Sequence, residues 1–469
     1  MSYLQTNTLP FKQRVEQQVN NEMVRKALVK AQETIGANRQ RMVDELGNWE
    51  EWRDDAKQIR NHVLANLDAY LYQLSEKVTQ NGGHVFFAET AEEATDYIKK
   101  VAKAKNAKKI VKSKSMVTEE IGMNHVLEAE GMTVVETDLG EYLLQIVGDK
   151  PSHIVVPAIH KDRFKIRQEL HDVLGYEGSE TPEEMTAFVR QKIREDFLGA
   201  DIGVSGCNFA VPETGSVCLV TNEGNLRMAT TVPKTHIAVM GMERIAPTFQ
   251  EVDVLITMLA RSAVGAKLTA YNTWLTGPRL EGETDGPEDF HLVIVDNGRS
   301  KILESEFQEV LRCIRCGACL NTCPAYRQIG GHGYGSIYPG PIGSVISPLL
   351  GGYEEFKELP YACSLCTACN SVCPVKIPLA QLILKHREKI ADAGLTPVTE
   401  RLSIFGFNFA NSHPTLWKAG VKVGAKVASK LIKNGKAPVN FGALGEWTKA
   451  RDLPNAEGES FREWFNNRG

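Results

Sequence analysis

The sequence predicts an α/β protein in which a mostly parallel β-sheet carries covering helices, with further helical regions before and after it. From about residue 83, short β-branched runs alternate with amphipathic helical segments, the pattern of parallel β-α-β units. Before that point, residues 11–75 are polar with apolar residues at helical spacing. After the sheet, eight of the ten cysteines crowd into residues 313–373. These observations separate a helical lead-in, a sheet domain and a cysteine-bearing region.

Composition is that of an ordinary globular protein. The chain has 469 residues, of which 42% are hydrophobic and 24% charged, and this length suggests about three domains. A net charge of -4 argues against nucleic acid as a partner. We find no apolar run of about 18 residues and no secretory signal. Clustered cysteines without an export signal indicate a reducing compartment, so we expect a cytoplasmic protein.

The sheet domain is expected over residues 81–300, after a helical lead-in at 1–80. Its first half should contain strands at 84–88, 109–115, 132–138 and 153–159, with helices at 91–105 and 118–131. The second half, from residue 201, is rich in short β-branched runs separated by Pro-Glu-Thr-Gly and Asn-Glu-Gly turns. The domain should close near Asn297.

Two places in this domain are candidate ligand sites. Lys112 and Lys114 leave a strand shortly before a helix expected at Thr118, and helix N-termini attract anions. Glu213 and Thr214 lie in a tight turn, where the glutamate is a candidate nucleophile or general base. The alternative at both places is purely structural: a helix cap with solvated lysines, and turn chemistry.

Two cysteine motifs carry the strongest signal. They read CIRCGACLNTCP at 313–324 and CSLCTACNSVCP at 363–374, and each has the C-x₂-C-x₂-C-x₃-C-P spacing of cluster-binding ferredoxins. Three thiolates at this spacing can surround one face of an iron–sulfur cubane, while the fourth serves the other cluster. Zinc is the alternative, but it prefers separated cysteine pairs or cysteine–histidine sets. The sequence therefore predicts two [4Fe–4S] clusters.

The crossed pattern divides the eight cysteines into two sets of four. Cluster 1 is assigned to Cys313, Cys316, Cys319 and Cys373, and cluster 2 to Cys363, Cys366, Cys369 and Cys323. A glycine-rich connection between the motifs should be flexible or lie on the surface. With a helix expected after each motif, the region 301–395 is interpreted as a helical two-cluster ferredoxin domain.

A basic stripe marks the C-terminal region, 396–469. Residues 401–445 contain no Asp or Glu, and lysines recur every three or four residues from Lys418 to Lys433. This spacing puts the ammonium groups along one side of a helix expected at 418–436. Such a helix could contact anionic lipid or an acidic partner, or its basic face could simply be solvated.

Taken together, these segments resemble the lactate-utilisation protein B family, also called LutB/YkgF. The resemblance runs nearly end to end and is most specific in VKSKSMVTEEIG and GCNFAVPETGSVCLVTNEGN, combined with both cysteine motifs. It implies a lactate-utilisation (LUD) domain similar in fold to sugar-phosphate isomerases and CoA transferases. It also implies action with companion proteins A and C in oxidising L-lactate to pyruvate. CoA transferases use a glutamate, and Glu213 could occupy a similar place, although fold likeness alone does not transfer chemistry.

Three functions remain open from the sequence. The first is an electron-transfer subunit that needs a partner for the two-electron step, since no flavin or nicotinamide fingerprint is visible. The second makes the sheet domain itself catalytic, binding the hydroxy acid near Lys112, Lys114 and Glu213. The third is a scaffold whose clusters are structural. The immediate electron acceptor is not identified by the sequence.

Overall fold

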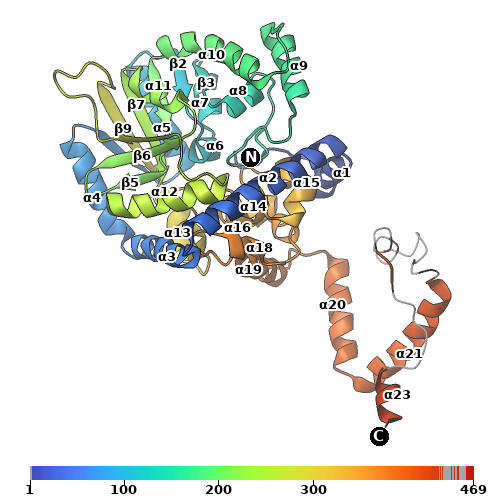
Figure 1. Ribbon diagram of the computed structural model, residues 1–469. Helices are drawn as coiled ribbons and strands as arrows, with labels where there is room; N and C mark the ends of the chain where they lie inside the picture. Colours follow the sequence, from blue (N-terminus) through green and yellow to red (C-terminus); the bar gives the residue numbers. More distant parts are fainter. Residues whose placement is uncertain are drawn as a thin grey trace. The chain divides into compact units, whose positions relative to one another are not determined.

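The computed structural model describes residues 3–432, 434, 436, 445, 448, 451–453 and 461–468. The chain forms two compact units, Met1–Ile390 and Ala391–Gly469, and each is considered by itself. The first unit holds the helical lead-in, the sheets and both cysteine motifs (Figure 1).

Four helices form the lead-in, which confirms the predicted helical N-terminal region. They are α1 (Phe11–Val19), α2 (Glu22–Leu46), α3 (Trp49–Ala65) and α4 (Leu67–Gln80). The Asn21 side chain accepts the Val24 N–H and so caps the start of α2, whose end is set by Gly47 at φ +88°.

The main sheet has six strands, all parallel, which confirms the predicted mostly parallel sheet. Its spatial order is β1 (His84–Ala88), β9 (Asp289–Val295), β7 (Thr235–Gly241), β4 (Ile202–Ser205), β2 (Lys109–Lys112) and β3 (Thr133–Glu136). Every residue of β4 and β7 is buried, as expected for central strands covered on both faces. A second, antiparallel sheet contains β5 (Phe209–Val211), β6 (Ser216–Thr221) and β8 (Tyr271–Leu275).

Helices of this domain connect successive strands. They are α5 (Ala91–Ala104), α6 (Met116–Glu120), α7 (Met123–Ala129), α8 (Leu139–Gln145), α9 (Arg163–Leu174), α10 (Pro182–Leu198), α11 (Asn225–Thr231) and α12 (Phe249–Ala263). The single helix predicted at 118–131 is in fact two, α6 and α7. Gly122 separates them at φ +66°, and a Cβ there would lie 2.3 Å from the Tyr3 ring.

The prediction of a strand at 153–159 is wrong. This apolar segment is an irregular loop, in which the His153 ring nitrogen Nδ1 accepts the N–H groups of Val155 and Val156. Just before it, the Ser152 backbone lies so close to Gly331 that a Cβ there would be 2.1 Å from the Ser152 oxygen. The segment is buried against the cysteine region instead of joining the sheet.

The cysteine region is helical, as predicted. Its elements are α13 (Arg299–Leu303), η1 (Gln308–Arg312), α14 (Ala318–Asn321), α15 (Pro324–Tyr334), α16 (Gly340–Gly351), α17 (Tyr353–Phe356), η2 (Leu359–Tyr361), α18 (Ala368–Val372) and α19 (Leu379–Asp392). The glycine-rich connection is neither flexible nor on the surface, contrary to expectation. It forms α15 and α16, and most of it is buried.

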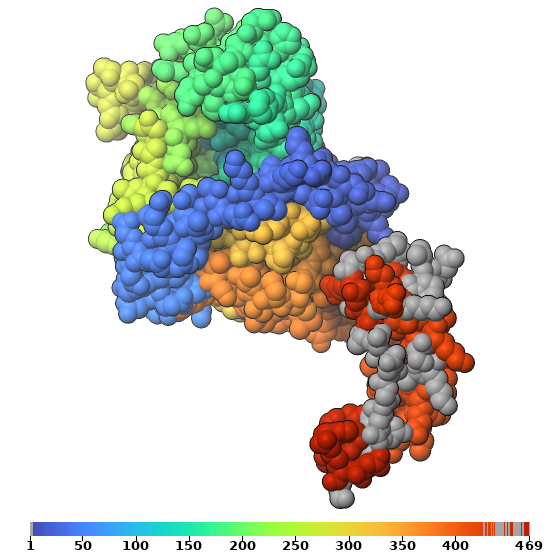
Figure 2. Space-filling model, turned by 45° about the vertical axis from the view of Figure 1, so that its right-hand side comes forward, coloured from blue at the N-terminus to red at the C-terminus, as the bar shows by residue number. Residues whose placement is uncertain are grey.

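The lead-in helices pack across this region, so it does not fold as an isolated ferredoxin. Gln32 of α2 donates from Nε2 to the Leu320 and Cys323 carbonyls, at 2.8 and 3.2 Å. Arg53 of α3 donates from Nε to the Cys373 carbonyl at 2.9 Å. Figure 2 shows the N-terminal helices in blue, lying between the sheet domain and the orange cysteine region.

In the second unit the structure describes α20 (Val398–Asn411), α21 (Pro414–Leu431) and α23 (Phe461–Asn466). The lysine helix predicted at 418–436 corresponds to α21, which ends at Leu431, and Lys433 lies outside the described residues. Among the described helices, none combines the length and apolarity needed to cross a bilayer.

Candidate functional site

The two cysteine motifs share one local backbone conformation. Cys313 Sγ accepts the N–H of Arg315 at 3.4 Å, and Cys363 Sγ accepts the N–H of Leu365 at 3.3 Å. Arg315 and Leu365 both have positive φ, +59° and +56°, which is uncommon for residues with a side chain. At the same point in each motif, the backbone therefore turns so that an amide proton faces sulfur.

The fourth cysteine of each motif receives a similar bond. Cys323 Sγ accepts the Tyr326 N–H at 3.5 Å, and Cys373 Sγ accepts the Ile377 N–H at 3.3 Å. Pro324 supplies the first residue of α15, where a missing N–H does no harm. Backbone N–H groups aimed at sulfur are suited to thiolates, whose negative charge they stabilise.

The thiols interact across the two motifs. Burial raises the pKa of Cys316, and the neighbouring Cys373 thiol raises it further. Burial also raises the pKa of Cys369 to about 12, with the thiols of Cys363 and Cys323 adding to the rise. Cys373 is thus an electrostatic neighbour of the first three thiols of the first motif, and Cys323 of Cys363 and Cys369. Without a metal, such packed thiols stay protonated, so a metal centre is needed to hold them as thiolates.

Spacing between the sulfurs suits a cluster better than a single ion. Four thiolates on one zinc at about 2.3 Å would lie about 3.8 Å apart. Among the described residues, groups of three potential ligand atoms within 4.8 Å of one another occur at His84, Asp289 and His291 and at Asp149, His160 and His332, and include no cysteine. Within the described residues, no three cysteine sulfurs therefore come as close together as the ligands of one zinc ion would.

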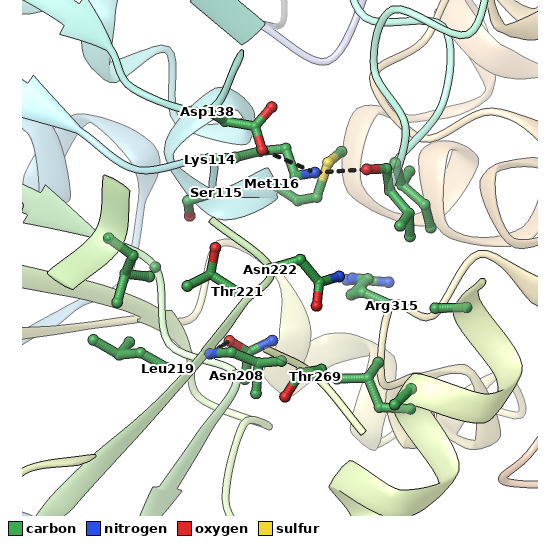
Figure 3. Close-up of a pocket in the computed structure, with 18 of the residues that line it drawn as sticks. Lys114, Ser115, Met116, Asp138, Asn208, Leu219, Thr221, Asn222, Thr269 and Arg315 are labelled. Carbon is green, nitrogen blue, oxygen red and sulfur yellow. Dashed lines mark hydrogen bonds and ion pairs between the residues drawn. The ribbon is translucent and has the colours of Figure 1, made fainter. Parts of the chain in front are cut away.

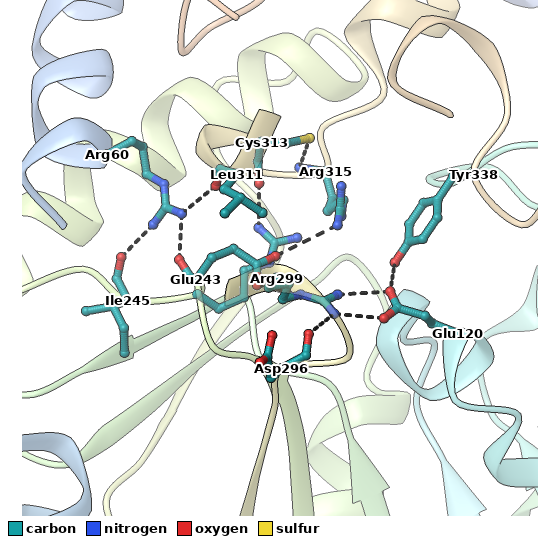
Figure 4. Close-up of polar contacts among 11 residues, drawn as sticks. Arg60, Glu120, Glu243, Ile245, Asp296, Arg299, Leu311, Cys313, Arg315 and Tyr338 are labelled. Atoms are coloured by element: carbon teal, nitrogen blue, oxygen red, sulfur yellow. Dashed lines mark hydrogen bonds and ion pairs between the residues drawn. The ribbon is translucent and has the colours of Figure 1, made fainter. Parts of the chain in front are cut away.

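A buried charge network lies against the first motif (Figure 4). Arg299 is fully buried and donates to both carboxylate oxygens of Glu120, at 2.8 and 2.9 Å, and to Glu243 at 2.8 Å. The Tyr338 hydroxyl donates to Glu120 at 2.8 Å. Burial alone would raise the pKa of Glu243, but the nearby arginines, Arg299 first, lower it to about 2.

Positive charge is in excess in this network. Three buried arginines and the largely buried Arg315 surround two glutamates: Arg60, Arg244 and Arg299, with Glu120 and Glu243. Arg244 Nη1 donates to the Cys313 carbonyl at 3.1 Å, which joins the network to the first motif. An uncompensated positive charge beside an anionic cluster favours its more negative, reduced form.

The second motif lies nearer the surface. Cys366 is exposed, whereas no cysteine of the first motif is: Cys313 is partly exposed and the other three are buried. The two motifs are close to each other, since α14 and α18 are in contact. The geometry therefore links a buried thiol set beside the sheet domain to a set that reaches the surface.

A pocket of about 350 Å³ opens between the sheet domain and the first cysteine motif (Figure 3). Lys114, Asp138 and Cys207 line it from loops that follow β2, β3 and β4. Arg244 and Arg315 line it from the side of the charge network. Burial raises the pKa of Cys207 to about 12, which disfavours its thiolate form.

The structure separates the ligand residues predicted from the sequence. Lys114 lines the pocket, but Lys112 is fully buried and pairs with Glu119 and Glu136, at 2.7 and 2.5 Å. Burial alone would lower the pKa of Lys112, whereas these carboxylates raise it. The lysine therefore stays charged and paired with the two glutamates.

Glu213 and Thr214 lie elsewhere, in the turn between β5 and β6. Glu213 is exposed, and the Thr214 carbonyl accepts a hydrogen bond from Asn81 at 2.9 Å. Neither residue lines the pocket. The two predicted ligand sites are therefore not one site.

Sequence reasoning missed Arg244 and Arg315. Arg315 lies inside the first motif, between Cys313 and Cys316, whose spacing alone carried the prediction. The available signal was the contrast with the second motif, where the equivalent residue is Leu365.

Comparison with known families agrees with the geometry. Residues 71–295 match the LUD domain, residues 309–377 the 4Fe-4S dicluster domain, and residues 385–469 the family described as "Lactate utilisation protein B, C-terminal". The dicluster match spans all eight motif cysteines and confirms the predicted pair of [4Fe–4S] clusters.

Curated relatives match over almost the whole chain. An "Uncharacterized electron transport protein YkgF" of Escherichia coli K12 is 72% identical over 98% of this chain and 97% of its own length. Proteins named "Lactate utilization protein B" from Bacillus licheniformis and Bacillus subtilis are 58% and 56% identical, each over 99% of this chain and 98% of their own length. A solved DUF162 family protein from Deinococcus radiodurans covers 49% of this chain at 17% identity, with a TM-score of 0.27, which is too low to inform the fold.

Proposed function

This chain belongs to the lactate utilisation protein B family, and from that premise we propose that it carries electrons in the oxidation of L-lactate to pyruvate. The observation that carries the proposal is the pair of interlocked cysteine motifs in a matched dicluster domain. Relatives named for electron transport and for lactate utilisation support the two halves of the statement.

We propose that cluster 1 is held by Cys313, Cys316, Cys319 and Cys373, and cluster 2 by Cys363, Cys366, Cys369 and Cys323. The crossed pKa effects between the motifs support this division. When bound, the clusters would supply one-electron redox chemistry. The chain's own contribution is to aim amide protons at the sulfurs and to surround cluster 1 with buried arginines.

The two clusters would form a short path for electrons. Cluster 1 would lie in the interior beside the pocket, and cluster 2 near the surface at Cys366. The arginines beside the first motif would make reduction of a cluster held there more favourable than it would be without them. The chain shows no flavin or nicotinamide fingerprint, so we assign the two-electron step to a partner.

We propose lactate-utilisation proteins A and C of the family as those partners. The decisive experiment is anaerobic assay of lactate oxidation with purified partners, with and without this chain. We expect about eight irons per chain, reduced-state EPR signals, and lactate-dependent cluster reduction only when the partners are present. Clusters that resist dithionite would instead favour the scaffold role, and lactate-dependent reduction of the isolated chain would favour a catalytic sheet domain.

For the C-terminal unit we propose contact with an anionic surface. Lys418, Lys422 and Lys430 are exposed on α21, and exposed apolar residues such as Phe405 and Phe407 lie on α20. A basic helix beside apolar side chains is suited to the headgroup region of a membrane. The protein would then be cytoplasmic and peripherally associated, directly or through its partners.

Vesicle flotation tests this surface. We expect the full chain to float with vesicles containing phosphatidylserine and to stay behind with phosphatidylcholine alone, with binding lost as salt screens the lysines. Lys418→Gln combined with Lys422→Gln should weaken the association, whereas Lys26→Gln on α2 should leave it unchanged. Equal binding to both vesicle types would contradict an electrostatic contact, and binding to an acidic partner protein instead would identify the other occupant.

A further inference from the structure

The pocket occupies the topological switch point of the parallel sheet. In the order β1-β9-β7-β4-β2-β3, the chain leaves β2 toward β3 on one side and leaves β4 toward β7 on the other. Loops that diverge from neighbouring carboxyl ends open a crevice, which is where open parallel sheets bind ligands. Lys114 and Ser115 follow β2 here, and Gly206 and Cys207 follow β4. A Cβ at Gly206 would lie 2.8 Å from the Ser115 hydroxyl oxygen, so a larger residue would narrow the crevice.

Arg315 is poised to bind a ligand there. Its side chain is only 9% exposed, yet Nε and Nη1 have no hydrogen-bond partner among the described residues. Its remaining contacts are loose: the guanidinium lies 4.6 Å from the centre of the Tyr338 ring, and Nη2 lies 3.8 Å from Glu243. A buried guanidinium with free donors is unfavourable unless an acceptor binds. Figure 3 shows Arg315 at the side of the pocket formed by the cysteine region.

Charge in the pocket favours a singly charged anion. Lys114, Arg244 and Arg315 oppose Asp138 and Glu223, which leaves one positive charge in excess. Lys114 is held by the Val155 carbonyl at 2.7 Å and lies 3.7 Å from Asp138, so the freer cation is Arg315. The two acidic groups would repel a doubly charged phosphate, while Thr221 and Asn222 offer neutral hydrogen-bonding groups.

We infer that this pocket binds a small carboxylate bearing a neighbouring hydroxyl or oxo oxygen, with Arg315 receiving the carboxylate. An arginine fork matches a carboxylate geometrically and can bind both oxygens. The inference rests on the proposed function, because its ligand class is that of lactate and pyruvate. It places the ligand next to the first motif, since the backbone N–H of Arg315 donates to Cys313 Sγ. A bound carboxylate would neutralise Arg315 and so disfavour reduction of cluster 1.

Equilibrium dialysis of labelled pyruvate against the full, cluster-loaded chain tests this directly. We expect saturable binding that L-lactate displaces and that inorganic phosphate and acetate displace poorly. Arg315→Gln should raise the pyruvate Kd by at least about tenfold, the size expected for a hydrogen bond to a charged group. Lys114→Gln should raise it by a smaller factor. Saturating pyruvate should also lower the reduction potential of one cluster in the wild type and leave it unchanged in Arg315→Gln.

Arg312→Gln is the matched control. Arg312 is a buried arginine next to Cys313, but it pairs with Glu309 and the Lys376 carbonyl and does not line the pocket. We expect its pyruvate affinity to equal that of the wild type. If Arg315→Gln loses iron, Lys114→Gln becomes the deciding variant. An unchanged pyruvate affinity in Lys114→Gln would then overturn the proposal that the pocket binds the carboxylate.

Other outcomes separate the pocket from the proposed function. A fully iron-loaded wild type that does not bind pyruvate, or an Arg315→Gln variant that binds it normally, overturns the pocket while leaving electron transfer intact. Stronger displacement by phosphate than by L-lactate overturns the carboxylate assignment. A wild-type chain that cannot be loaded with about eight irons counts against the proposed function instead.

Discussion

Replacing Cys373 with serine should remove the same cluster that Cys313→Ser removes, although the two residues belong to different motifs. In the crossed arrangement both residues are ligands of cluster 1, so each variant should fall from about eight to about four irons per chain. Both should retain the EPR signal and potential of the remaining cluster 2. Cys323→Ser and Cys366→Ser should form the complementary pair, which retains cluster 1. The measurement is iron content together with the reduced-state EPR spectrum and a redox titration.

Cys207→Ser supplies the control for this series. Cys207 is a thiol outside both motifs, with no place among the proposed ligands, so its variant should keep the full iron content and both signals. An uncrossed arrangement predicts a different result. Cys373→Ser would then lose the same cluster as Cys366→Ser, and Cys323→Ser the same cluster as Cys313→Ser. That pairing would refute the assignment of the fourth ligands without questioning the clusters themselves.

The parts of this site that the sequence revealed are those encoded locally. Motif spacing constrains which thiols can reach one cubane, and the structure adds the matching amide bonds at Arg315 and Leu365. Strand–helix alternation likewise predicted the parallel sheet, because the β-branched residues of each strand indicate by themselves that the strand is buried. Caps such as Asn21 also act over a few residues only.

What the sequence could not reveal depends on contacts between distant segments. The run at 153–159 has the composition of a buried strand, but its burial comes from the cysteine region more than 150 residues later. The composition of a segment indicates that the segment is buried, but it does not indicate which other part of the chain covers it. The glycines of α15 were misread for the same reason: Gly331 permits close approach to Ser152, which from sequence alone resembles flexibility. Arg315 lines the pocket only because the fold brings the loops after β2 and β7 to the same pocket.

Replacing Arg299 with methionine should destabilise the Met1–Ile390 unit by about 3–5 kcal/mol, because it leaves the buried Glu120 carboxylate without its counter-ion and removes the nearest arginine from Glu243. Arg299 and Glu120 have fully buried side chains, and Glu243 is almost fully buried. The network joins α6, the loop after β7 and α13, so its loss would also loosen the wall between the sheet and cluster 1. Anaerobic urea unfolding of the cluster-loaded chain, followed by circular dichroism, measures the change.

Two companion variants separate charge burial from other effects of the substitution. Lys234→Ala breaks an exposed ion pair with Glu288, 3.6 Å long, and should change stability by less than about 1 kcal/mol. Adding Glu120→Gln to Arg299→Met removes one of the stranded charges and should restore part of the loss, since the amide can still bond Asn297 and Tyr338. If Arg299→Met lowers the free energy of unfolding no more than Lys234→Ala does, the stability of the buried network does not depend on charge balance. The same conclusion follows if adding Glu120→Gln to Arg299→Met lowers that free energy further.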